Sequence, residues 1–283
     1  MMLRRARPLL GTFVEITVGA ASEAFAQRAA TAGFAAIADV HRLMSFHEHD
    51  SDLSRINRHA HLRAVEVDPR TFAVLRRARF LSRASKGLFD CTVGGALLSL
   101  GALPRSDASP CPDANATFRD VALLAGHRVR LRRPLAIDLG GIAKGFAVDE
   151  AVAAIARSGA DAACVNAGGD LRVFGDRAWP VALRTPDGFA PLPALRNRAL
   201  ATSADTFASR GAIVDPATRR LRADPKSVSI LAPTCMDADA LTKVVWLANG
   251  PPPGLLETMH ACALVLGGSA IAALPAAAHR AAG

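Results

Sequence analysis

The spacing of hydrophobic and polar residues predicts long helices interspersed with short strands. Apolar residues recur at helical intervals over 22–43, and further helices are expected at 69–85, 142–157 and 235–249. Alternation of apolar and polar residues over 11–18 (GTFVEITV) is typical of a strand. Shorter strands are expected at 128–131, 135–139, 163–166, 171–174, 179–184, 199–202, 212–214, 228–232 and 261–266.

The order of these elements predicts the fold class. Helices and strands do not follow a strict βαβ alternation, so we expect an α+β fold with mostly antiparallel sheets packed with helices. Residues 50–57 are polar and turn-rich, and 97–118, rich in Gly, Pro, Ser and Asp, are expected to be a loop or insertion. The Ala-rich end, 270–283, is expected to be a frayed tail.

Composition narrows the class of protein. The chain has 283 residues, of which 51% are hydrophobic, and this excludes an intrinsically disordered protein. Its five cysteines, an odd number at low density, exclude a disulfide scaffold. They show no CxxC spacing, so neither a zinc site nor a redox pair is indicated. Lys and Arg number 34 against 25 Asp and Glu, and this net charge of +9 suits an anionic ligand. Nucleic acid is not expected as a partner, because no recognition helix or interleaved aromatic residues accompany the charge.

The N-terminal segment predicts neither export nor membrane insertion. Its apolar run is interrupted by Pro8, Gly11, Thr12 and Glu15, so it lacks the continuous core of a signal peptide. No stretch reaches the roughly 20 apolar residues of a membrane span. We therefore expect a soluble, cytoplasmic protein without a membrane span.

Residues 137–145 (IDLGGIAKG) are the most informative segment for chemistry. A strand ends at Asp138, two glycines turn the chain, and a helix begins with Lys144 near its first turn. A glycine turn allows close approach of a ligand, and a helix N-terminus with a nearby lysine favours phosphate or pyrophosphate. An ordinary tight turn with a surface lysine is the alternative, because the spacing matches neither the P-loop nor GxGxxG.

Three further patterns are weaker. Residues 165–170 (VNAGGD) place a second Gly–Gly turn after a strand, and this turn could border the same nucleotide site as residues 137–145. Asp239 and Lys243 lie four residues apart on one helix face, either as a surface ion pair or with Asp239 as a Mg²⁺ ligand. Histidines crowd 41–61, including H-E-H at 47–49, and are more typical of a solvated loop than of a metal site.

Together these segments resemble the FAD:protein FMN transferase (ApbE) family. The similar strings follow the family's order over nearly the whole chain, and we expect a single flavin-transferase-like domain over 1–283. The strings are LGT at 10–12, MSFHEHDSDLSRIN at 44–57, GLFDCTVG at 87–94, IDLGGIAKGFAVD ending at Asp149, VNAGGD at 165–170, ALATS at 199–203, IVDPAT at 213–218 and DADALT at 237–242.

The resemblance implies a reaction and a set of site residues. FMN would be transferred from FAD to a Thr or Ser hydroxyl of an acceptor flavoprotein, with release of AMP. The residues implied to line the FAD site are Leu10, His47, Leu88, Phe89, Asp90, Asp138, Lys144 and Ile213. The implied metal, Mg²⁺, would bind the Gly141 carbonyl and Asp239.

This sequence departs from the family pattern at several positions. Ala212 stands where the family has a His thought to act as general base, so Asp215, His47 or a water would have to replace it. Lys243 stands where the family has a metal-binding Thr, and an ammonium cannot ligate Mg²⁺ but could replace part of its charge. Ala204 and Arg219 stand where the family usually has glycine.

These departures leave alternatives open. With Asp215 and Lys243 in catalytic roles, the chain would be a working transferase. An FAD-binding carrier or sensor with little catalysis would also retain the binding strings. An FAD hydrolase giving FMN and AMP would use water in place of the acceptor hydroxyl.

Overall fold

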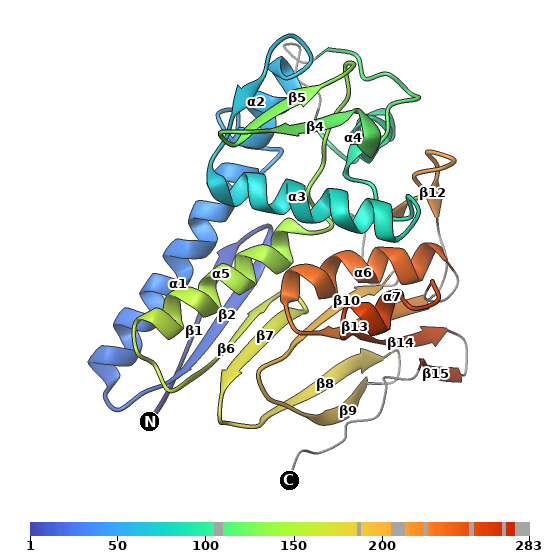
Figure 1. The fold of residues 1–283 in the computed structure, drawn as a ribbon. Coiled ribbons are helices and arrows are strands. Elements are labelled where there is room, and N and C mark those ends of the chain that lie inside the picture. Colours follow the sequence, from blue (N-terminus) through green and yellow to red (C-terminus); the bar gives the residue numbers. More distant parts are fainter. Residues whose placement is uncertain are drawn as a thin grey trace.

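A large antiparallel sheet forms the lower half of the molecule in Figure 1. The computed structural model describes residues 1–104, 110–185, 188–204, 213–222, 226–248, 252–267 and 270–274. The strands of the sheet follow the order β1 (Met2–Leu9), β2 (Thr12–Gly19), β6 (Ala162–Ala167), β7 (Asp170–Gly175), β10 (Ala199–Ala204), β13 (Lys226–Ala232), β14 (Cys262–Gly267) and β15 (Ala270–Leu274).

Long helices cover one face of this sheet. They are α1 (Glu23–Met44), α5 (Ala143–Arg157) and α6 (Cys235–Leu247). Helix α5 packs between the other two and against β6 and β7, whereas α6 packs against β10 and β13. The Ser22 hydroxyl accepts the Phe25 N–H at the start of α1, and Thr234 caps α6 in the same way. The short helix α7 (Leu255–Thr258) precedes β14.

Because side chains alternate between the two faces of the sheet, neighbouring residues of a strand belong to two separate cores. Ala163, Val165 and Ile230 belong to the core under the helices, whereas the adjacent Ala162 and Leu231 belong to a second core. In that second core, the hairpin of β8 (Trp179–Thr185) and β9 (Gly188–Leu195) packs apolar side chains against the sheet. The sheet is therefore covered by helices on one face and by a hairpin on the other.

A second layer lies above α5 and α6 in Figure 1. Its elements are α2 (Asp52–His59), β3 (Val65–Glu66), α3 (Pro69–Ala84), η1 (Cys91–Val93), α4 (Gly94–Ser99), η2 (Phe118–Asp120), β4 (Val121–Leu124) and β5 (Arg128–Leu131). The strands of this layer pair antiparallel in the order β3-β5-β4. The guanidinium of Arg77 on α3 donates to both carboxylate oxygens of Asp237 on α6, at 2.7 and 2.9 Å, and so joins the two layers.

The predicted α+β fold class is confirmed. Among the described residues, no helix combines the length and apolar character needed to cross a membrane, and all five cysteines are free. The strands β1, β3, β4, β9 and β12 were not predicted. Strand β9 contains two prolines and, among the described residues, pairs only within its hairpin. Part of the expected tail, Ala270–Leu274, is strand β15 paired with β14, whereas 275–283 lie outside the described residues.

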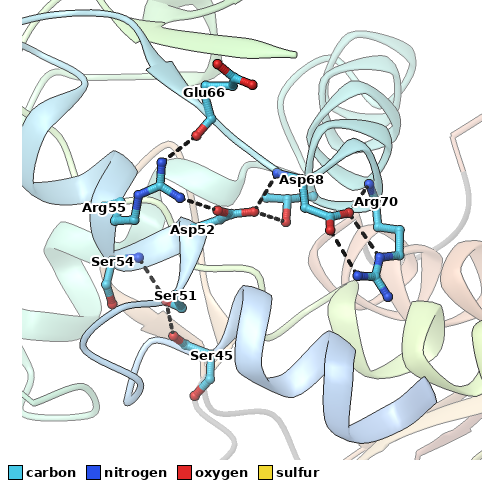
Figure 2. A network of polar contacts seen from close by, with 9 residues as sticks. Ser45, Ser51, Asp52, Ser54, Arg55, Glu66, Asp68 and Arg70 are labelled. Carbon is cyan, nitrogen blue, oxygen red and sulfur yellow. Dashed lines mark hydrogen bonds and ion pairs between the residues drawn. The ribbon is translucent and has the colours of Figure 1, made fainter. Parts of the chain in front are cut away.

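The polar segment at 50–57 is mainly helix α2, whose polar side chains hold this layer together (Figure 2). Leu53 and Ile56 are fully buried and give the short helix an apolar face. The buried carboxylate of Asp52 accepts from the Arg55 guanidinium, the Asp68 N–H and the Thr71 hydroxyl, each at 2.8 Å. The expectation of a turn was wrong because these contacts stabilise a polar helix.

Residues 135–139, predicted as a strand, pair with no strand in the described part of the chain. Their hydrogen bonds go to a side chain and a loop instead. The Asn57 amide donates to the Ile137 carbonyl at 2.9 Å and accepts the Ile137 N–H at 2.8 Å. The Asp138 N–H donates to the Cys91 carbonyl at 2.8 Å. Asn57 therefore replaces a neighbouring strand and fixes the backbone just before Asp138.

Asn57→Ala is predicted to destabilise the fold. The substitution leaves the buried N–H and C=O of Ile137 without partners, which costs about 2–4 kcal/mol of unfolding free energy. Urea unfolding measures the loss, and Asn115→Ala, at an exposed site, is the matched control. Equal unfolding free energies for the two variants would contradict the role given to Asn57.

The Asp68–Arg70 pair in Figure 2 predicts a pH dependence. The hydrogen bond from the Arg70 guanidinium, at 2.9–3.0 Å, outweighs burial and lowers the pKa of Asp68 below its ordinary 3.8. A lowered pKa stabilises the fold above the ordinary value, and that stability is lost as pH falls through the folded-state value.

Asp68→Asn is therefore expected to reduce the loss of stability in acid, while asparagine keeps the helix cap. Urea unfolding between about pH 3 and pH 6 compares the slopes of the variant and the parent. Asp176→Asn, at an exposed position, serves as control. A slope unchanged by Asp68→Asn would refute the prediction.

Candidate flavin-diphosphate site

The loop that carries Asp138 brings a carboxylate next to the Gly–Gly turn. The Gly140 N–H donates to the Asp138 carboxylate at 3.2 Å. Burial raises the pKa of Asp138, while the Gly140 hydrogen bond and the charges of Lys243 and His47 oppose the rise. A methyl group at Gly141 would lie 3.4 Å from Lys243 Cε and 3.7 Å from Phe89 Cε2. Asp138, Gly141, Lys243 and Phe89 therefore meet at one place.

Two lysine–aspartate pairs lie beside this turn. The Lys243 ammonium is bonded to a carboxylate oxygen of Asp239, which is fully buried on α6. The Lys144 ammonium is bonded to Asp170, a residue only 2% exposed at the start of β7. Both lysine side chains are more exposed than their partners, at 36% for Lys144 and 22% for Lys243. The cations therefore lie between the buried carboxylates and solvent.

The two pairs form one electrostatic cluster. Burial alone would raise the pKa of Asp239, but the charges of Lys243 and Lys144 outweigh it and hold the pKa of Asp239 below its ordinary value. Burial opposes the charge on Lys144, yet Asp170 and Asp239 together raise the pKa of Lys144 above its ordinary value. The raised pKa keeps Lys144 charged at neutral pH, on the solvent side of the buried carboxylates.

The first turn of α5 contributes one backbone donor to the same cluster. Its N-cap residue, Ile142, makes no side-chain capping bond, and the first turn contains no acidic residue. The Gly145 N–H donates to Asp239 at 3.2 Å. The positive end of α5 and the two ammonium groups favour an anion, although Asp170 and Asp239 already neutralise part of this charge.

Close packing of α5 on α6 sets this geometry. A methyl group at Gly145 would overlap the Cys235 carbonyl oxygen, so only glycine fits there. One turn further, the Asp149 carboxylate accepts the N–H groups of Cys235 and Met236, both at 2.9 Å. Asp149 thus caps α6 from the neighbouring helix.

The turn between β1 and β2 lies against the second Gly–Gly turn. Leu10 and Gly11 have φ of 55° and 69°, as a two-residue hairpin requires. A methyl group at Gly168 would lie 2.5 Å from the Thr12 hydroxyl oxygen. Because Asp170 follows this turn directly, Leu10 is brought to the same edge of the sheet as Lys144.

Asp90 is held by the protein itself. Its carboxylate accepts the Thr92 N–H at 2.8 Å, the Thr92 hydroxyl at 2.7 Å and the Phe118 N–H at 3.1 Å. The neighbouring Phe89 is buried and Leu88 is half-buried against the core. In this segment Asp90 fixes the backbone, and Phe89 is the side chain next to Gly141.

The hairpin of β11 (Ile213–Val214) and β12 (Leu221–Arg222) carries the other predicted site residues. Ile213 is half-buried and packs against the core. Asp215 accepts N–H groups of its own turn, from Ala217 at 2.8 Å and Thr218 at 3.4 Å. Ala212 lies outside the described residues. Asp215 is therefore not joined to the lysine–aspartate cluster by any contact among the described residues.

Arg219 stands where the family usually has glycine, and its hydrogen bonds hold it in a glycine-like conformation. Its φ of 56° is the left-handed conformation that glycine adopts most easily. The guanidinium donates to the Thr92 carbonyl at 3.0 Å and to the Ala116 carbonyl. These bonds dock the hairpin on η1, next to the segment that contains Phe89.

The implied metal ligands do not fit a divalent cation. Lys243 occupies one carboxylate oxygen of Asp239, and the Gly145 N–H occupies the other. Lys243 also donates to the Asp239 carbonyl oxygen at 3.1 Å, and its side chain lies beside Gly141. In the described ranges, no three His, Cys, Asp or Glu side chains form a group that could hold a metal. The residues present suit an ammonium in this position.

Several site residues were missed by the sequence reasoning. Asp170 and Asp149 lie within the quoted strings, but their partners, Lys144 and the α6 N-terminus, are distant along the chain. Asn57 also lies in a quoted string, and its partner Ile137 is 80 residues away. Only pairing in three dimensions could reveal these roles.

Comparison with known proteins agrees with the resemblance. A model of the ApbE family matches residues 10–259. A Treponema pallidum protein named FAD:protein FMN transferase is 32% identical over 281 residues, covering 84% of this chain and 76% of the relative.

Solved structures of this family have a similar fold. The ApbE protein of Thermotoga maritima is 27% identical, with a TM-score of 0.81 over 96% of this chain and 97% of that chain. The flavin transferase ApbE of Vibrio cholerae is 25% identical, with a TM-score of 0.80 over the same shares. Sequence and fold together establish that this chain belongs to the ApbE family.

Proposed function

We propose that this chain is an FAD:protein FMN transferase. The acceptor is a flavoprotein whose Ser or Thr hydroxyl oxygen forms a bond to the phosphorus atom of the FMN half of FAD. The bond from that phosphorus to the bridging oxygen breaks, AMP leaves with this oxygen, and the hydroxyl proton passes to a base. The observation that carries the proposal is the pair of lysines beside the N-terminus of α5.

Phosphoryl transfer depends mainly on positioning and on stabilising charge. Lys144 and Lys243 would bind the oxygens of the diphosphate at the positive N-terminus of α5. Phe89 and Leu10 would contact the flavin or adenosine portions from either side of the Gly–Gly turns. The buried Asp170 and Asp239 hold the two ammonium groups in place.

The proton acceptor is proposed from two side chains. Asp215 lies in a turn of the β11–β12 hairpin. His47 is exposed, and it lies close enough to Asp138 to influence the pKa of that carboxylate. Loss of a general base typically lowers the rate by about 10²–10⁴-fold. The variants His47→Gln and Asp215→Asn distinguish the two candidates, because only the variant that lacks the base should lose this much of the transfer rate.

Magnesium is not needed in this proposal, because Lys243 already supplies a positive charge at Asp239. The cytoplasmic location expected from the sequence stays a prediction. The acceptor is defined here only by its chemistry, as a flavoprotein that presents a hydroxyl group.

The transfer reaction is tested by incubation with FAD and a hydroxyl-bearing acceptor flavoprotein. We expect covalent flavin on the acceptor in a denaturing gel and an equal amount of AMP. Lys144→Met is predicted to lower the rate by about 10²–10³-fold because it removes charge stabilisation, whereas Lys144→Arg retains part of the activity. Binding of FAD without AMP release over hours would contradict the proposal and favour a flavin carrier.

Two variants of Lys243 test whether the lysine has replaced a metal ion at Asp239. Lys243→Thr and Lys243→Met both leave Asp239 buried without its cation, which costs about 3–5 kcal/mol of unfolding free energy in EDTA. Threonine adds an oxygen ligand, so excess Mg²⁺ is expected to recover part of the loss in Lys243→Thr only. The parent protein should not respond to Mg²⁺. Equal stabilisation of the parent and Lys243→Thr by Mg²⁺ would show that the ion binds beside Lys243.

A further inference from the structure

We propose that a basic groove next to the flavin site binds an acidic segment of the acceptor protein. This inference rests on the proposed function, because it concerns the protein substrate of the same reaction. The groove has a volume of about 580 Å³, and its cationic lining residues are Arg79, Arg83, Lys86, Arg119 and Arg132. We call it the arginine groove.

The charges of the arginine groove come from separate parts of the chain. Arg79, Arg83 and Lys86 follow one another at intervals of four and three residues along and just after α3. Arg119 lies in η2, and Arg132 directly follows β5. The fold therefore gathers positive side chains around one hollow, and no carboxylate lines it among the described residues.

Neighbouring acids do not neutralise these cations. Asp113 and Asp120 pair with Arg133, and Asp237 pairs with Arg77. None of the five groove cations makes an ion pair within the part of the chain that the structure describes. A concentration of uncompensated charge in a concave surface attracts anionic partners.

The position of the groove connects it with the reaction. The Phe118 ring, which lines the groove, lies 3.9 Å from where a methyl group at Gly87 would stand. The Phe118 N–H is bonded to Asp90, next to the buried Phe89. The segment 87–90 thus separates the groove from the flavin site. An acceptor that brings a hydroxyl to the flavin diphosphate would therefore have the groove beside it, across this segment.

The lining favours a peptide over nucleic acid. The lining of the groove includes Val121 and Leu123, which can contact apolar side chains of a peptide. Phe118 is only 6% exposed, and the Arg119 guanidinium lies 4.6 Å from the centre of its ring. No free aromatic face in the described lining is therefore available for stacking bases, as single-stranded nucleic acid requires.

The test uses a fluorescein-labelled octaglutamate peptide and, as a neutral control, octaglutamine. Fluorescence anisotropy without FAD should show binding of octaglutamate that weakens with added salt. The double variant Arg79→Glu/Arg83→Glu is expected to weaken this binding by about tenfold or more. The matched variant Arg28→Glu/Arg196→Glu, with the same change in charge at exposed positions on other parts of the chain, should bind nearly as the parent does.

Further controls separate the groove from the fold and the flavin site. Unchanged thermal unfolding and unchanged FAD binding in the groove variant show that both are intact, and Arg79→Gln/Arg83→Gln replaces it if it fails to fold. Equal binding of octaglutamine, or an equal loss in both double variants, would overturn the proposal. Stronger binding of an oligothymidine, or complete competition by inorganic phosphate, would also overturn it.

A transfer assay then connects the groove with the acceptor. With an acidic acceptor, the groove variant is expected to raise the KM for the acceptor while leaving the KM for FAD unchanged. Peptide binding is measured independently of catalysis, so failure of the transfer reaction and failure of the groove proposal are distinguishable.

Discussion

The candidate site depends on one close contact between helices. Gly145 lets α5 approach the first turn of α6 so closely that any side chain would meet the Cys235 carbonyl. The Asp149 carboxylate locks the same crossing by capping α6. Because α5 carries Lys144 and α6 carries Lys243, this crossing brings the two ammonium groups to one place.

Burial of carboxylates explains why these lysines are held in position. A buried ion is costly unless it is paired, and Asp170 and Asp239 are almost completely buried. Each lysine therefore stabilises a buried carboxylate, and in the proposed function it also directs charge toward the diphosphate. In this chain Lys243 takes the place at Asp239 that the family resemblance gave to a metal ion.

Local sequence patterns predicted a large part of the fold. Helix α1 was predicted because its apolar residues recur at helical spacing after Ser22, and α3 because Asp68 and Pro69 are typical of a helix start. Two predictions that were wrong, for α2 and for residues 135–139, have a common cause. Helix α2 and the segment 135–139 owe their conformations to hydrogen bonds between residues far apart in sequence, such as Asn57 with Ile137.

The same distinction applies to the site. Lys144, Gly141, Asp239 and Lys243 were identified from short strings, and the structure brings them together with Asp138. It does not join Asp215 to them among the described residues, and it uses Asp90 to fix a loop. Short strings indicate which residues belong to a family pattern, whereas the structure shows which of them face one another.

Calorimetric titration in EDTA, comparing FAD with riboflavin, tests most directly whether the lysine cluster binds a flavin diphosphate without a metal. The account predicts that FAD binds, that its affinity falls with added salt, and that riboflavin, which lacks the phosphates, binds about 100-fold more weakly. Equal affinities for the two flavins, or no heat on addition of FAD, would contradict it.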